Sequence, residues 1–220
     1  MPGSPSSAER AAAPGGPIAE AKLAAIEAHL HQREARRDDL FQRARKLRRL
    51  SQATMLRLHE AKASEAEIAS IRTGITELTE FSRRAGRADE GLAMDAFQEA
   101  VEASLLAAVV AGRELPGPTD LGVEPEPYLL GLGDLVGEVR RLALDHLASG
   151  DLANADAALT LMDRLVRVLM RFDTTRSIVA LKPKQDVARA LLEKTRGDVT
   201  MAHVFRGGSP PPPLRREGEA

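Results

Sequence analysis

Two pairs of acidic residues stand in otherwise apolar helical sequence. Glu99 and Glu102 lie three positions apart in DAFQEAVEA, and Asp134 and Glu138 lie four positions apart in YLLGLGDLVGEVRR. Both spacings place the members of a pair on one face of an α-helix. Because the neighbouring residues are mainly Leu, Val and Ala, we expect both helices to be largely buried. A buried carboxylate must be paired with a cation, protonated or bound to a metal.

Four carboxylates from two facing helices would offer a site made entirely of oxygen ligands. Such ligands suit Mg²⁺, Mn²⁺ or Ca²⁺ better than Zn²⁺ or Cu²⁺, and Mg²⁺ held in this way can activate water at a phosphodiester. A ferritin-like di-iron centre needs Glu-x-x-His motifs, and none of the five histidines has Glu three residues before it. The alternative is a structural role, in which the acids pair with Arg84, Arg140 or Arg141.

The charges of the chain are segregated, although the formal net charge is only −1. Residues 33–49 carry eight bases and three acids, whereas residues 89–138 carry eleven acids and one base. Arginines at helical spacing in the first segment predict a phosphate-binding helix face, and the alternative is an ordinary solvated face. Phe41 is the one aromatic residue in this segment. Binding by this face would therefore be mainly electrostatic, with little base stacking.

The composition excludes several classes of protein. The absence of Cys excludes disulfide scaffolds, thiolate zinc sites and cysteine nucleophiles. Aromatic residues make up 3% of the chain, which argues against a β-sandwich or barrel. No apolar run is long enough for a membrane span, and the N-terminus does not have the pattern of a signal peptide. We therefore expect a cytoplasmic protein without a membrane partner.

The elements that must position the acidic and basic groups are all predicted to be helices. Ser64 and Glu67 form an S-x-x-E capping box, and a proline-rich stretch, residues 114–127, predicts a loop. We expect an all-α antiparallel bundle of about six to seven helices in one domain, residues 18–207. Disordered tails are expected at residues 1–17 and 208–220. The expected helices cover residues 18–62, 64–84, 89–112, 127–149, 153–172 and 183–205.

Two features of these helices point beyond a simple bundle. A first helix of this length would span about 65 Å, so part of it must face a partner or a ligand. Apolar positions recur along one face of its second half, at Leu40, Leu47, Leu50, Thr54, Leu58 and Ala61. In the helix of the second acidic pair, Gly131, Gly133 and Gly137 fall within seven residues. Because Gly is unfavourable inside a helix, they predict a close helix approach or ligand contact.

Three segments of the chain resemble the translin and Trax family. Residues 127–151, PYLLGLGDLVGEVRRLALDHLASGD, resemble its signature helix, and FQEAVEA at residues 97–103 resembles the Trax F-Q-E-x-V-E-A motif. The stretch from Leu181 to Gly207, with HVFRG near its end, resembles the last helix of the family. The full acidic set favours the Trax-like branch.

The resemblance implies a translin-like helical subunit that assembles into a hollow octamer. It implies binding of single-stranded RNA, with single-stranded DNA as a further candidate, by a homo-oligomer or together with a translin-like subunit. In Trax-like members four carboxylates support Mg²⁺-dependent endoribonuclease cleavage, which assigns both catalysis and binding of Mg²⁺ (or Mn²⁺) to Glu99, Glu102, Asp134 and Glu138. Nucleic-acid contacts carry over to Arg43, Arg45, Arg48 and Arg49. The competing hypotheses are a non-catalytic single-strand binder of this fold and a helical scaffold without a nucleic-acid role.

Overall fold

The computed structural model describes residues 20–85, 91–172 and 178–205, and every regular element in these ranges is a helix. The predicted all-α class is therefore confirmed. The two predicted tails lie outside the described residues. No described helix combines the length and the apolar character that a membrane span requires. The helices are α1 (Glu20–His59), α2 (Glu65–Ala85), α3 (Gly91–Val110), α4 (Pro118–Leu121), α5 (Pro125–Ser149), α6 (Leu152–Met170) and α7 (Lys182–Phe205).

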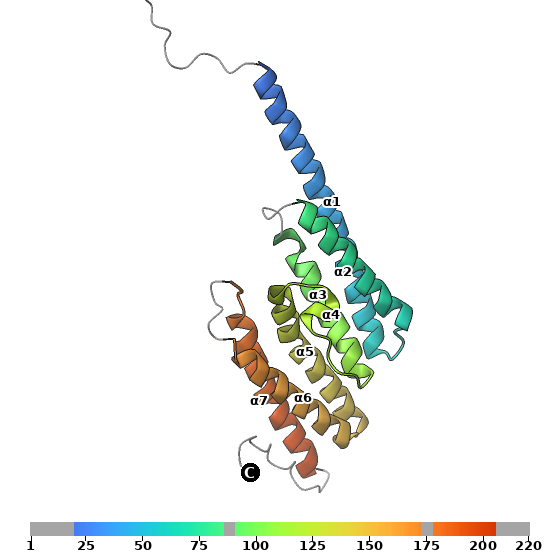
Figure 1. Ribbon diagram of the computed structural model, residues 1–220. Helices are drawn as coiled ribbons and strands as arrows, with labels where there is room; N and C mark the ends of the chain where they lie inside the picture. Colours follow the sequence, from blue (N-terminus) through green and yellow to red (C-terminus); the bar gives the residue numbers. More distant parts are fainter. Residues whose placement is uncertain (1–19, 86–90, 173–177, 206–220) are drawn as a thin grey trace, which may run out of the picture.

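Helices α3 and α5 lie at the centre of the bundle (Figure 1). Helix α3 packs against α1 and α2 on one side and against α5 on the other. Helix α5 in turn packs against α6 and α7, which also contact each other. Apart from the short α4, the described helices therefore form two groups of three, joined where α3 meets α5.

Helix α3 can join the two groups because it is apolar on two faces. Its small side chains Ala93, Ala96, Ala100 and Ala103 are buried in the core shared with α1 and α2. Its larger side chains, among them Val101, Leu105 and Leu106, are buried in the core shared with α5, α6 and α7. The alanine face lets α1 and α2 approach closely, and the branched side chains fill the larger core.

The glycines of α5 lie where neighbouring helices come nearest. A Cβ atom on Gly131 would lie 2.7 Å from the carbonyl oxygen of Gln98 and 2.8 Å from Cγ1 of Val101, both on α3. A Cβ atom on Gly133 would lie 2.9 Å from Cβ of Lys184 on α7. The predicted close approach is therefore confirmed at these two positions. At Gly137 the nearest atom would be 3.9 Å away, which is ordinary contact.

The first half of α1 projects beyond the bundle (Figure 1). All residues from Glu20 to Asp39 are exposed, and burial begins at Leu40. Twenty residues of helix correspond to about 30 Å. Three large apolar side chains on this half, Leu23, Ile26 and Leu30, are 40–54% exposed. The expectation that part of the first helix cannot be covered within one domain is therefore confirmed.

The buried face of α1 differs in detail from the predicted one. Ala44 and Ser51 are buried on it, whereas Leu50 is only half-buried. Ala61 lies beyond the helix with φ 54°, in the turn that follows. Small side chains are selected here because this face packs on the alanine face of α3.

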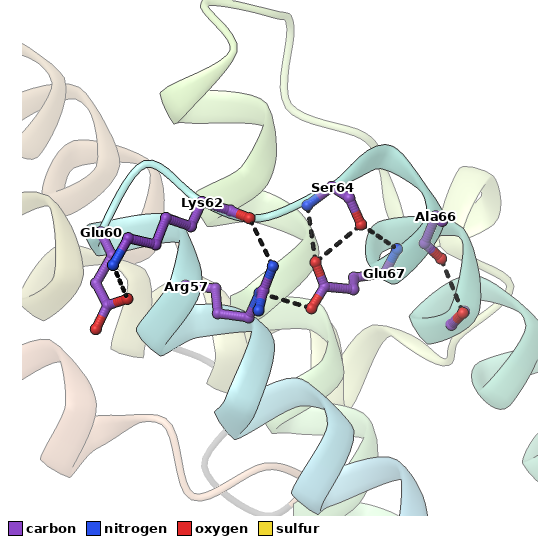
Figure 2. A network of polar contacts seen from close by, with 7 residues as sticks. Arg57, Glu60, Lys62, Ser64, Ala66 and Glu67 are labelled. Atoms are coloured by element: carbon purple, nitrogen blue, oxygen red, sulfur yellow. Dashed lines mark hydrogen bonds and ion pairs between the residues drawn. The ribbon is translucent and has the colours of Figure 1, made fainter.

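The turn between α1 and α2 is fixed by a polar network (Figure 2). The backbone N–H and the hydroxyl of Ser64 both donate to Oε2 of Glu67 at 2.8 Å, and the backbone N–H of Glu67 donates to Oγ of Ser64 at 3.3 Å. The predicted capping box is therefore confirmed. Arg57 connects it to α1, because its Nε lies 2.8 Å from Oε1 of Glu67 and its Nη2 donates to the carbonyl of Lys62. The network holds α2 in its direction back along α1.

The segment predicted as a loop, residues 114–127, contains α4 and the start of α5. Pro118 and Pro125 each occupy the first turn of a helix, where the fixed φ of proline is favourable and its missing N–H costs nothing. Asp120 accepts a hydrogen bond from the backbone N–H of Gly117 at 2.8 Å. The expectation of a helix start at Pro127 was thus two residues late, and α7 begins one residue before the predicted Pro183.

We predict that Gly131→Ala destabilises the protein by about 1–3 kcal/mol, because the new methyl group would meet the α3 backbone, which cannot yield as a flexible side chain could. Gly197→Ala in α7 is the matched control. It meets nothing within 4 Å, so it should stabilise the helix by up to about 1 kcal/mol. Urea denaturation measures both changes, and equal stability of the two variants would contradict the close α3–α5 contact.

Candidate functional site

The four predicted acidic residues lie at the junction of α3 and α5. Glu99 and Glu102 are on α3, Asp134 and Glu138 are on α5, and these helices pack together. The side chains of Glu99, Asp134 and Glu138 are 23%, 24% and 24% exposed. The negative charges of these three residues all act on Glu102. The structure therefore brings the whole predicted set into one electrostatic neighbourhood.

Glu102 is the most strongly perturbed of the four groups. Burial raises its pKa to about 8, and the charges of Asp134, Glu138 and Glu99 act in the same direction. The nearby ammonium of Lys184 lowers the pKa, with a smaller effect. Without a bound cation, the Glu102 carboxyl is therefore largely protonated at neutral pH.

Glu99 is held at the edge of the site that faces α1. Burial raises its pKa, against the effects of a hydrogen bond from Gln52 and of the charge of Arg48. Nε of Arg48 lies 3.9 Å from Oε1 of Glu99. Oε2 of Glu99 is buried and, within the described part of the chain, accepts no hydrogen bond. A buried carboxylate oxygen without a donor is costly, so this atom is suited to a ligand.

The two acids of α5 have partners from other helices. Asp134 accepts a hydrogen bond from Nε2 of Gln98 at 2.5 Å and forms an ion pair with Nζ of Lys184. Glu138 hydrogen-bonds to Nε2 of His59, whose side chain is only 4% exposed. Nδ1 of His59 is buried and has no hydrogen-bond partner among the described residues.

These contacts shape what the site can do as it stands. Among residues 20–85, 91–172 and 178–205, no three His, Asp or Glu side chains form a ready-made metal site. The oxygens of Asp134 and Glu138 are instead directed toward Lys184, Gln98 and His59. If the acids had only a structural role, Arg84, Arg140 or Arg141 was expected to pair with them. Two of these arginines have partners outside the cluster. Arg140 binds Thr195 and Asp198 at 2.6 and 2.9 Å, and Arg84 lies 4.0 Å from Glu80.

The sequence did not identify three residues that contact the acids of α5: Gln98, His59 and Lys184. Gln98 had a local signal, because it lies four residues before Glu102 and thus on the same helix face. His59 ends α1 and Lys184 lies in the first turn of α7, and no spacing in the sequence connects either residue to α5. Their contribution depends on tertiary packing.

The four predicted arginines of α1 do not share one face. Arg43 is paired with Asp39 at 3.1 Å, and its guanidinium lies 4.6 Å from the centre of the Phe81 ring of α2. Arg45 and Arg48 line a surface pocket on the α3 side, together with Phe41. Arg49 is exposed. The two arginines on the α3 side, with Gln52, lie in a row that leads to Glu99.

A curated protein matches part of this chain in sequence. No family model matches the sequence. A protein of Methanocaldococcus jannaschii described as "Uncharacterized protein MJ0175" is 37% identical over 103 residues, which is 46% of either chain. The chain thus matches less than half the length of that relative.

Solved structures match over nearly the whole fold. The structure of AfC3PO is 31% identical, with a TM-score of 0.77 over 85% of this chain and 100% of that chain. A structure of AfC3PO in complex with duplex RNA gives 31% identity and a TM-score of 0.77 over 86% and 100%. Apo-NeC3PO, at 19% identity and a TM-score of 0.76 over 85% and 100%, supports the fold alone. The chain belongs to the translin-like family of the C3PO proteins.

Proposed function

We propose that this protein binds RNA and cleaves it by Mg²⁺-dependent hydrolysis of the phosphodiester, as a Trax-like member of its family. The observation that carries the proposal is the α3–α5 carboxylate cluster, defined as Glu99, Glu102, Asp134 and Glu138. Burial, together with the charges of the other three members, raises the pKa of Glu102 to about 8. Such a concentration of partly buried negative charge is typical of a cation site.

The carboxylate cluster fits a hard divalent cation. All its donors are oxygens, which Mg²⁺ and Mn²⁺ prefer. The buried Oε2 of Glu99 lacks a partner among the described residues. A cation would also offset both the burial and the repulsion that raise the pKa of Glu102. When bound, Mg²⁺ would neutralise charge at the phosphodiester and activate water.

The protein's own groups would orient the ligands and handle the proton. Gln98 fixes Asp134 and His59 fixes Glu138 through their hydrogen bonds. Glu102 has a pKa of about 8 without metal, and a bound cation would lower this pKa and leave the carboxylate ionised, so we assign it as the general base. Its carboxylate would take a proton from the attacking water as the new P–O bond forms. The same proton would pass to the leaving oxygen as the old P–O bond breaks.

Two observations support RNA binding: the basic row on α1, formed by Arg45 and Arg48, and the solved structure of AfC3PO with RNA. The AfC3PO structure that matches this chain contains duplex RNA. In this protein Arg45 and Arg48 are exposed on the α3 side of α1, where they could direct a phosphate chain toward Glu99. Because the sequence resemblance implies single strands and the relative holds a duplex, tests should include both forms of RNA.

An oligomer belongs to the same proposal. The exposed apolar side chains Leu23, Ile26 and Leu30 lie on one side of the projecting half of α1. Exposed apolar stripes on a projecting helix are commonly covered by another subunit. We propose that this subunit is a second copy of the chain or a translin-like partner.

Cleavage tests the catalytic assignment directly. We expect wild-type protein to cut unstructured RNA in the presence of Mg²⁺, and Glu138→Gln and Asp134→Asn to reduce the rate by at least about a hundredfold. Binding of RNA should persist in both variants, because they do not alter the arginines of α1. The measurement is the initial rate on end-labelled RNA.

Glu193→Gln is the matched control. Glu193 is an acid of α7 whose side chain is 66% exposed and pairs with Arg196 rather than with the carboxylate cluster. It should cleave like the wild type. Equal rates in all four proteins would reveal a contaminating nuclease. Binding without cleavage in Mg²⁺ or Mn²⁺ would instead establish the non-catalytic binder, and an absence of binding at low salt would establish the scaffold.

The salt dependence of binding tests the basic row. Each phosphate contact removed should lower the slope of log K against log salt concentration by about 0.7–0.9. Arg45→Gln and Arg48→Gln should each show this decrease. Arg43→Gln should change the slope less, because its guanidinium is already engaged with Asp39 and Phe81. A larger effect of Arg43 than of Arg48 would place the nucleic acid on the α2 side instead.

The pKa of Glu102 predicts a pH dependence of stability in metal-free protein. The folded pKa is about 8 and the ordinary value is 4.5, so between these values the folded state holds a proton that the unfolded state lacks. Stability should therefore decrease as pH rises from about 4.5 to about 8 and then level off. Glu102→Gln should remove this part of the decrease, measured by urea denaturation with a chelator present. Parallel curves for the variant and the wild type would show that Glu102 titrates normally.

A further inference from the structure

Lys184 is the cation closest to the carboxylate cluster on the α5 side. It lies in the first turn of α7, and its Nζ is ion-paired with Oδ1 of Asp134. Its charge also acts on Glu102. One ammonium group thus interacts with two of the four carboxylates, one on each helix.

The position of Lys184 depends on the backbone of α5. A Cβ atom on Gly133 would lie 2.9 Å from Cβ, 3.4 Å from Cγ and 3.7 Å from Cδ of Lys184. The aliphatic part of the lysine therefore lies directly against Gly133, one residue before Asp134. Any larger residue at position 133 would push the lysine away, so the glycine sets the reach of the ammonium group.

Partial burial makes this ammonium group important for charge balance. The side chains of Lys184 and Asp134 are 31% and 24% exposed, so water screens their interaction only in part. On the other side of the cluster, Arg48 approaches Glu99 only to 3.9 Å. Lys184 is thus the basic group in direct contact with the α5 acids, together with the His59 imidazole on Glu138.

We propose that Lys184 is the internal counter-cation of the carboxylate cluster, and that a divalent cation must displace its ammonium group from Asp134 in order to bind. This inference rests on the proposed metal-dependent function and adds to it a residue that opposes metal binding. The free energy of breaking the Lys184–Asp134 pair is subtracted from the affinity for the metal, because only the fraction of molecules with a free Asp134 is competent to bind.

A purely structural lysine would behave differently. If Lys184 only ties α7 to α5, its removal should weaken the fold and leave the affinity for metal unchanged or lower. If it is the counter-cation, its removal should raise that affinity. The two roles therefore predict opposite signs for one measured quantity.

The experiment is a calorimetric titration of the whole chain with Mn²⁺ after treatment with a chelator, and it measures the dissociation constant for Mn²⁺. We expect Lys184→Met to bind Mn²⁺ about tenfold more tightly than the wild type. Without metal the variant should unfold at a lower temperature, because its carboxylates have lost their cation, and saturating Mn²⁺ should remove most of that difference. Lys184→Arg, which keeps the charge, should bind Mn²⁺ much more weakly than Lys184→Met.

Lys182→Met is the matched control. Lys182 lies in the same turn of α7, but its ammonium pairs with Asp186 at 2.8 Å, away from the cluster. Its removal should leave the affinity for Mn²⁺ unchanged. If Lys184→Met is poorly folded, as judged by circular dichroism, Lys184→Gln provides the same loss of charge with a polar side chain.

The possible outcomes separate this inference from the proposed function. Equal or weaker Mn²⁺ binding by folded Lys184→Met or Lys184→Gln, beside a wild type that binds, overturns the counter-cation and leaves the nuclease intact. Tighter binding in the neutral variants without RNA cleavage by any form supports the counter-cation and removes the nuclease. Failure of wild type and neutral variants alike to bind Mn²⁺ overturns both.

Discussion

The close contact between α3 and α5 is the constraint on which the rest of the structure depends. Gly131 brings the α5 backbone so near to Gln98 that no Cβ atom fits between them. The same residue, Gln98, then donates to Asp134 one turn further along α5. A backbone contact and a side-chain hydrogen bond thus fix the register of the two helices. That register decides that Glu102 experiences the charges of Asp134 and Glu138.

This arrangement stores electrostatic repulsion at the centre of the molecule. A core made only for stability would avoid four carboxylates in a shared, partly buried region. Apolar residues of similar volume would fill the same space without the free energy needed to desolvate charged groups. The chain instead keeps the acids and surrounds them with Gln98, His59 and Lys184. Each of these partners satisfies some oxygens, yet Oε2 of Glu99 keeps no partner among the described residues. The fold therefore holds the acids in place without fully neutralising them, as the proposed binding of an external cation requires.

Sequence reasoning found the acids because their pairing within a helix is local. The spacings of Glu99 with Glu102 and of Asp134 with Glu138 determine a common face before any tertiary contact forms. The Ser64–Glu67 capping box and the glycines of α5 were predictable for the same reason. Lys184 and His59 were not, because they reach α5 from the opposite ends of the chain, and their contribution is created by packing. The short helix α4 was missed since four residues carry no periodicity, and proline reads as a loop signal as readily as a helix start.

The basic and acidic segments, which are separate in the sequence, come together where α1 packs against α3. Arg45 and Arg48 lie on the α3 side of α1, and Arg48 is the basic residue of this row that comes near Glu99. A phosphate chain drawn to these arginines would next approach carboxylates that repel it. Coulomb repulsion between like charges a few ångströms apart is substantial in a partly buried region, so arginines alone cannot bring a phosphodiester to Glu99. A cation between phosphate and carboxylates removes that barrier. For the function we propose, the arginines of α1 therefore hold the RNA without metal, whereas entry of the phosphodiester into the carboxylate cluster requires a bound metal ion. The ammonium of Lys184, already present on Asp134, sets the free energy that binding of this metal ion has to exceed.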